Sequence, residues 1–295
     1  MYRIHCGEYR AEINPRGAGL KSLTFRGDNL VETYEEDQTP PMYAGLVLAP
    51  WPNRTADGHF TWKGQSYDLP VNEPERGNAI HGLVAQAHWQ PVEVHGDSVR
   101  LTTPLRRPWP WAVNLDIEYR LDAHGLLIRL HADTERAAGA DSAQAPEGEE
   151  PGAEPSPFAF GLHTFLSARG AATDECELSI PVSEHHLLDS RNLPTGEVHP
   201  ARISHQRISE VNWDDCFRGE GPLQVDYVHP ASGRGVRMEM GTGLDWVQLF
   251  TPDDYPGRGR ALAVEPMSAP PNALVSGTDL ATTPVDFELR LSGLG

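Results

Sequence analysis

The sequence has few cysteines, few basic residues and no long apolar run. Its three cysteines, Cys6, Cys176 and Cys216, are too few and too scattered for a disulfide framework or a zinc cage. Lys and Arg number 24 against 42 Asp and Glu, and the net charge of −18 disfavours nucleic acid and anionic membranes as partners. No apolar stretch is long enough to span a bilayer, and residues 1–6 lead into strand-like sequence without a signal peptide. We therefore expect a cytoplasmic protein that binds neither nucleic acid nor membrane.

Helical periodicity is nearly absent, and alternation with a period of two residues takes its place. In residues 113–121 every second residue is apolar, and the same pattern recurs in 225–227, 236–240 and 285–291. Such half-buried strands, separated by turns that 28 Gly and 26 Pro can supply, predict an all-β antiparallel β-sandwich. The length fits one large domain of this type, spanning residues 1–295.

One segment, residues 135–156, does not fit a packed domain. It contains six acidic residues, one basic residue and no large apolar side chain. Such a stretch cannot bury enough surface to offset the entropy of ordering it. Because it falls between the apolar segments 126–132 and 157–166, we expect a mobile acidic loop inserted within the domain. The alternative is a loop that acts as a lid or docks a partner.

A single acidic residue, Glu265, ends the alternating apolar stretch that begins at Arg260. The proline-rich sequence from Pro266 to Pro271 follows immediately. This pattern predicts a carboxylate held rigidly at the end of a strand, at a sheet edge, where it can act as a general base. Taken alone, the pattern is more typical of an ordinary exposed glutamate at the end of a strand.

Two histidines lie in similarly ordered surroundings. His81 is followed by Gly82, and His163 lies in the apolar segment 157–166. Both are expected to be partly buried, and each by itself could be a core histidine bonded to a backbone carbonyl. What favours function is the order of motifs along the chain, from the histidines to Glu265.

This order resembles the aldose 1-epimerase (galactose mutarotase) family over nearly the whole chain, in particular its less characterised aldose 1-epimerase-like branch. The similar segments are 11–23, Pro52-Asn53-Arg54, Ile80-His81-Gly82, His163-Thr164-Phe165, 213–217 and Val264-Glu265-Pro266. The resemblance implies a large β-sandwich, similar to the galactose mutarotase supersandwich, with a sugar groove across one concave sheet. It also implies a small monosaccharide as ligand and no cofactor.

The resemblance also implies catalytic roles. Glu265 would remove the proton of the anomeric hydroxyl, and His163 would protonate the ring oxygen. His81 would hydrogen-bond near the same oxygens. Because carboxylates lie nearby, we expect His163 to be held in its protonated form.

The family pattern further implies substrate-binding residues. Asp214 and Arg54 would hold ring hydroxyls, with Asn53 beside them. The function implied is interconversion of the α and β anomers of a free aldose such as glucose or galactose. Two alternatives stay open: a hexose-6-phosphate 1-epimerase, for which only Arg54 and Arg76 offer positive charge, and a non-catalytic sugar-binding or sensing module. We expect a monomer or a weak homodimer.

Two histidines and a carboxylate are also a known metal-binding set. However, His81, His163 and Glu265 are separated from one another by about 80 residues or more, without the short His-x-His spacing that many metal sites show. The sequence therefore predicts no metal.

Overall fold

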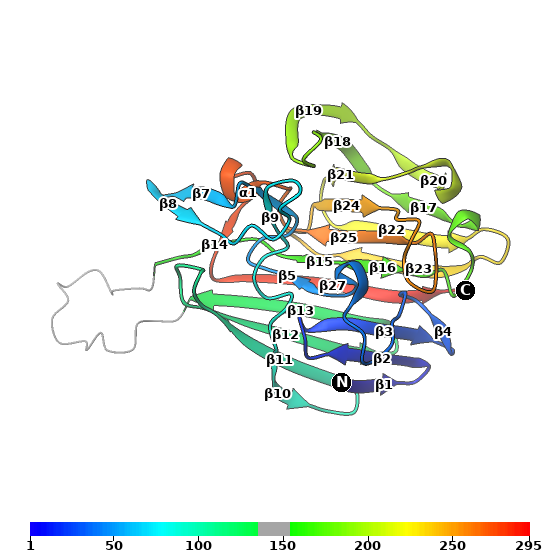
Figure 1. Cartoon of the computed structure of the whole chain (residues 1–295). Helices are drawn as coiled ribbons and strands as arrows, with labels where there is room; N and C mark the ends of the chain where they lie inside the picture. Colours follow the sequence, from blue (N-terminus) through cyan, green and yellow to red (C-terminus); the bar gives the residue numbers. More distant parts are fainter. Residues whose placement is uncertain (135–153) are drawn as a thin grey trace.

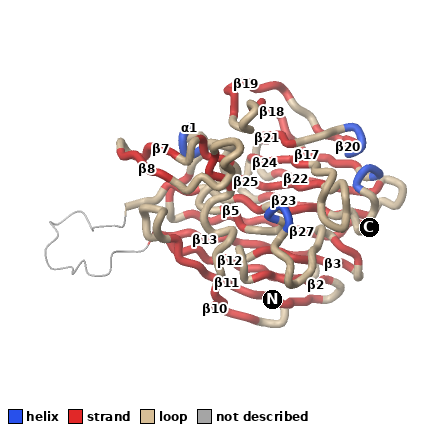
Figure 2. The backbone as a smooth tube through the Cα atoms, in the orientation of Figure 1, coloured by secondary structure: helices blue, strands red, loops and turns tan. Residues whose placement is uncertain are grey.

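The computed structural model describes residues 1–134 and 154–295. The described chain is almost entirely strand and turn, as Figure 2 shows, and its helical segments are short. They are Pro41–Tyr43, Thr173–Glu175, Ile208–Glu210 and α1 (Ala273–Ser276). The all-β prediction is therefore confirmed. The acidic insert predicted at 135–156 lies, apart from its last three residues, outside the described residues.

The larger of two main sheets has nine strands in the order β10-β11-β12-β13-β27-β23-β22-β17-β20. The strand near the C-terminus, β27, lies in its middle between β13 and β23 (Figure 1). The bounds are β10 (Gln90–Val94), β11 (Ser98–Leu105), β12 (Val113–Asp122), β13 (Gly125–Thr134), β17 (Glu177–Ile180), β20 (Ile203–Arg207), β22 (Leu223–His229), β23 (Arg234–Met240) and β27 (Val285–Leu294).

The second main sheet has eight strands, in the order β19-β18-β21-β24-β25-β15-β5, with β16 also paired to β25. The bounds are β5 (Val47–Leu48), β15 (Gly161–Leu162), β16 (Thr164–Leu166), β18 (Val182–Leu188), β19 (Pro194–Pro200), β21 (Asp214–Gly219), β24 (Trp246–Phe250) and β25 (Leu262–Met267). All ladders between these strands are antiparallel.

Smaller antiparallel sheets complete the fold. A four-stranded sheet has the order β1-β2-β3-β4, and the remaining strands form the pairs β6-β9, β7-β8 and β14-β26. The bounds are β1 (Tyr2–Cys6), β2 (Tyr9–Asn14), β3 (Gly19–Phe25), β4 (Asp28–Asn29), β6 (Arg54–Ala56), β7 (His59–Trp62), β8 (Gln65–Asp68), β9 (Asn78–Ile80), β14 (Pro157–Phe158) and β26 (Ala281–Thr282).

The predicted alternation corresponds to one buried face of the nine-stranded sheet. Every second residue of β12, from Val113 to Leu121, is buried, while the intervening polar residues are at least partly accessible. A single cluster of buried apolar side chains contains Ile117 of this sheet together with Leu249 and Val264 of the eight-stranded sheet. The two sheets therefore share one core, in which each fully buried aliphatic side chain contributes about 1.5–3 kcal/mol.

No helix among residues 1–134 and 154–295 has the length and apolar character needed to cross a bilayer.

Candidate active site

Glu265 lies inside a central strand, which corrects the predicted position at a strand end on a sheet edge. Strand β25 continues through Pro266 to Met267, and it is flanked by β24 on one side and by β15 and β16 on the other. The sequence argument assumed that Pro266 ends the strand, because proline has no N–H to donate to a neighbouring strand. However, proline can occupy a central strand where the neighbouring ladder is interrupted. Glu265 is thus 2% exposed and not a surface residue.

The interruption next to Pro266 is what brings His163 to Glu265. On one side of the gap Gly161 pairs with Met267, and on the other side Thr164 pairs with Val264. The two ladders share one register, and this register places His163 directly opposite Glu265. The His163 backbone bonds instead to the segment before β5, at Gly45 and Leu46. His163 Nε2 lies 3.4 Å from Glu265 Oε1.

On its other side Glu265 faces Gln248 of β24. Because directly opposed residues of an antiparallel pair point to the same face of the sheet, both side chains enter the same space. The Gln248 Nε2 amide donates to Asp214 Oδ1 at 2.8 Å, and Asn192 Nδ2 donates to the other carboxylate oxygen of Asp214. Three neighbouring strands of one sheet therefore deliver Asp214, Gln248 and Glu265 together.

A short pair of strands, β6 and β9, supplies the opposite wall. Their ladder pairs Arg54 with Ile80, and the His81 N–H then donates to the Asn53 carbonyl at 2.9 Å. The residue after His81 is a glycine, Gly82, because a Cβ at this position would lie 2.1 Å from the Ala49 carbonyl oxygen. This close backbone approach fixes the turn that carries His81.

Arg54 is bound to a buried carboxylate, Glu73. Its Nε and Nη2 atoms donate to the two Glu73 oxygens at 2.9 Å each. Burial opposes ionisation of Glu73, but hydrogen bonds from Arg54 and Asn78 outweigh it, so its pKa lies below the ordinary value. A bidentate pair of this kind holds the guanidinium in one orientation.

Several residues at the site adopt left-handed backbone conformations. The φ values are 48° at Met42, 60° at Tyr43, 53° at Asn53 and 62° at His81. Non-glycine residues in this region carry strain, which concentrates at functional sites. The Tyr43 ring contacts the His81 ring, with centroids 4.7 Å apart.

These side chains surround one small cavity of about 150 Å³. All six residues that the sequence analysis proposed for catalysis or substrate binding line it. The full lining is Met42, Tyr43, Asn53, Arg54, His81, His163, Asp214, Gln248, Phe250 and Glu265. The structure thus brings the predicted residues together, and their individual roles stay predictions. His81, His163 and Glu265 are also close enough to hold a metal ion.

Burial changes the protonation expected for the central pair. It lowers the pKa of His163 to about 3. Burial and the nearby charge of Asp214 raise the pKa of Glu265 to about 8. The pKa of His81 is also well below its ordinary value, because of burial and the neighbouring His163 and Arg54. In the ligand-free site at neutral pH, one proton therefore lies on Glu265, and His163 is neutral.

This differs from the protonated His163 expected from the sequence. The sequence argument considered the attraction of nearby carboxylates and left out the cost of burying separate charges. His163 is 4% exposed, so that cost is large.

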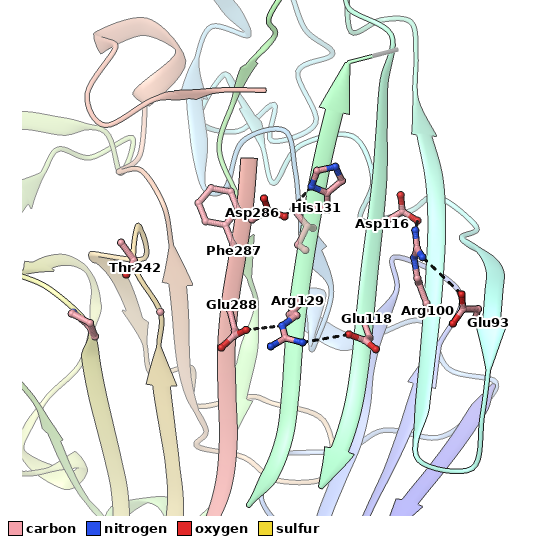
Figure 3. Close-up of a pocket in the computed structure, with 13 residues that line it drawn as sticks. Glu93, Arg100, Asp116, Glu118, Arg129, His131, Thr242, Asp286, Phe287 and Glu288 are labelled. Carbon is pink, nitrogen blue, oxygen red and sulfur yellow. Dashed lines mark hydrogen bonds and ion pairs between the residues drawn. The ribbon is translucent and has the colours of Figure 1, made fainter. Parts of the chain in front are cut away.

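A larger hollow, of about 800 Å³, lies on the solvent-facing side of the nine-stranded sheet (Figure 3). Its charged side chains are paired across strands, with Arg129 Nε 2.6 Å from Glu288 Oε2 and His131 Nδ1 2.9 Å from Asp286 Oδ1. These groups are exposed and satisfy one another. The hollow therefore lacks the buried, unpaired acid–base groups of the smaller cavity.

Sequence reasoning missed four residues that line the cavity, Met42, Tyr43, Gln248 and Phe250, and also Glu73 beside it. Gln248 had a usable signal, since it is a polar residue at an inward position of the apolar strand Trp246–Phe250. Tyr43 is brought to the cavity by the strained turn before β5, and no local pattern marks it. Glu73 is bound to Arg54 through a contact between residues 19 positions apart, which no periodicity indicates.

The chain belongs to the aldose 1-epimerase family, whose model matches residues 1–283. It is 32% identical over 286 residues to the uncharacterized protein YihR of Escherichia coli K12, covering 94% of this chain and 86% of that protein.

Two solved structures show the same fold at lower identity. A galactose mutarotase-like protein from Clostridium acetobutylicum matches with a TM-score of 0.80 at 18% identity, over 99% of this chain and 94% of that one. Galactose 1-epimerase from Lactobacillus acidophilus matches with a TM-score of 0.76 at 15% identity, over 99% and 93%. The galactose mutarotase-like fold expected from the sequence is thereby confirmed.

Proposed function

We propose that this protein interconverts the α and β anomers of a free aldose by acid–base ring opening and reclosure. The observation that carries the proposal is the opposed pair of His163 and Glu265, 3.4 Å apart and both buried beside a cavity. Membership of the aldose 1-epimerase family supports it, and so does the name of the L. acidophilus enzyme with the same fold.

The proposed reaction begins with one proton on the pair. Sugar hydroxyls that donate to Glu265 favour its ionised form, and the proton moves across the short gap to His163. Glu265 then takes the proton of the anomeric hydroxyl while His163 protonates the ring oxygen, and the C1–O5 bond breaks. Rotation about C1–C2 and the reverse transfers close the ring on the other face. General acid–base catalysis of this kind contributes about 10²–10⁴-fold for each group.

The remaining cavity residues suit the binding of ring hydroxyls. Asp214 accepts one amide hydrogen bond on each oxygen, and an ionised carboxylate has about four acceptor sites, so some remain for sugar hydroxyls. Arg54, held by Glu73, and Asn53 offer donors on the opposite wall. His81 lies beside His163 with ring centroids 5.2 Å apart, within reach of the same sugar oxygens.

The alternative of a 6-phosphorylated substrate has less support. Of the described residues that line the cavity, Arg54 is the only arginine or lysine. Its guanidinium already binds Glu73, and so does Arg76, whose Nη1 lies 2.9 Å from Glu73 Oε1. A phosphate would have to compete with this buried carboxylate.

The experiment is exchange NMR of the anomeric protons on a panel of free aldoses and their 6-phosphates, with wild type and Glu265→Gln compared. Faster exchange with wild type alone would support the proposal. A sugar-dependent rise in melting temperature without any acceleration would instead identify a non-catalytic sugar-binding module.

A further inference from the structure

His81, His163 and Glu265 meet the geometric requirement for a metal site. Each offers one ligand atom, and these atoms all lie within 4.8 Å of one another. The three side chains come from three separate segments, each of which is anchored by backbone hydrogen bonds. The three residues are far apart in the sequence, which argued against a metal site, but the fold brings them together.

The distances suit a zinc-class cation. Ligands bound tetrahedrally at 2.0–2.1 Å lie roughly 3.3 Å from one another. His163 Nε2 and Glu265 Oε1 are already 3.4 Å apart. The remaining ligand-atom distances are at most 4.8 Å, so the His81 side chain has to move closer to complete three ligands, and the cavity of about 150 Å³ leaves space for a fourth.

Each of the three side chains also has a buried polar atom without a partner. His81 Nδ1, His163 Nδ1 and Glu265 Oε2 are buried and make no hydrogen bond within the described part of the chain. A metal ion bound to His163 Nε2 and Glu265 Oε1 would replace the contact between these two atoms. Two imidazoles and one carboxylate form a donor set typical of zinc and its neighbours among the divalent transition metals.

We propose that His81, His163 and Glu265 form a transition-metal site, and that a zinc-class cation bound there inhibits the protein by occupying the pair that transfers protons. This inference goes beyond the proposed function, because the reaction proposed above uses no metal. The same three side chains would bind either the sugar or the metal ion, and a bound metal ion would exclude the sugar.

The direct test is titration of the metal-free protein with Co²⁺, followed through the visible d–d absorption of a low-symmetry cobalt site and without any sugar. We expect one such site per chain in wild type and an affinity at least about 10-fold weaker in Glu265→Gln and in His163→Asn, since each variant removes one of the three ligands. The matched control is His131→Asn, which removes an exposed histidine paired with Asp286 and should bind as wild type does. Circular dichroism checks that each variant is folded.

Equal cobalt affinity in wild type and both ligand variants would place the metal elsewhere and overturn the proposal, as would the absence of cobalt absorption in wild type. A kinetic measurement is independent of this test: Zn²⁺ should inhibit anomer exchange competitively with sugar, and a chelator should restore the rate. Activation by Zn²⁺ would contradict the inhibitory role. Failure of the proposed function would leave the cobalt result unchanged, so the two ideas fail separately.

Discussion

Arg54 and Glu73 form a bidentate ion pair in which both side chains are less than 10% exposed, at 9% and 7%. Glu73 also accepts hydrogen bonds from Arg76 and Asn78. It is therefore the centre of a polar network that fixes one wall of the cavity. Removing one partner of such a pair leaves the other charge buried without compensation.

We accordingly expect Glu73→Gln to lower the free energy of unfolding by about 3 kcal/mol, measured by chemical denaturation. The matched control is Glu288→Gln, whose carboxylate pairs with Arg129 at a site where both side chains are about half exposed. That change should stay within about 0.5 kcal/mol of wild type. Equal effects of the two substitutions would show that the buried pair contributes no more than a surface pair.

Replacing the proposed acid–base pair should remove activity without unfolding the chain. In Glu265→Gln the amide cannot accept the anomeric proton, so anomer exchange should fall by about 10³-fold or more. His163→Asn should cost about 10²–10⁴-fold, and His81→Asn less than either, because His81 is proposed to bind and not to transfer a proton. Exchange NMR measures all three. Activity of Glu265→Gln within about threefold of wild type would remove Glu265 from the mechanism.

The pH profile follows from the number of protons on the pair. The active pair carries one proton, which it loses as the pH rises through the pKa of Glu265, about 8. It gains a second proton only near the pKa of His163, about 3. The rate constant kcat/KM should therefore hold across the neutral range and fall above about pH 8, and both limits belong to the coupled pair. If kcat/KM instead falls to half its maximum as the pH rises through about 6.5, the acid is a histidine with an ordinary pKa.

The pKa of Glu265 also predicts how stability changes with pH. Because its folded-state pKa is raised from the ordinary value of 4.5 to about 8, the folded state holds this proton more tightly than the unfolded state does. The resulting stabilisation is complete below pH 4.5 and is lost as the pH rises to about 8. Wild type should therefore lose stability as the pH rises through this range. Glu265→Gln has no such proton and should not lose it, so its melting temperature should rise relative to that of wild type. A constant difference between the two proteins from pH 4.5 to 8 would contradict the assignment.

Much of the fold could be predicted because alternation is a local signal. The buried residues of β12 follow from their spacing alone. The position of Glu265 could not be predicted in the same way, because Pro266 normally ends a strand. Only the pairing of β15 and β16 with β25 shows that the strand continues and that the gap is filled by His163.

The candidate site was predictable in its members and not in its protonation. The order of motifs pointed to Asn53, Arg54, His81, His163, Asp214 and Glu265, and all six line one cavity. The degree of burial, which moves the proton from His163 to Glu265, depends on packing between residues far apart in the chain. Sequence patterns carry no measure of it.

The last prediction concerns the substrate. Free aldose should be a better substrate than its 6-phosphate, because the arginine in the described lining of the cavity already binds Glu73 and because the chain carries a net charge of −18. The measurement is kcat/KM for each member of matched pairs, such as glucose and glucose 6-phosphate, at constant ionic strength. Raising the salt concentration provides the control, since it should narrow the difference by screening the repulsion of the phosphate. A higher kcat/KM for the phosphorylated sugar would contradict this prediction and would favour a hexose-6-phosphate 1-epimerase.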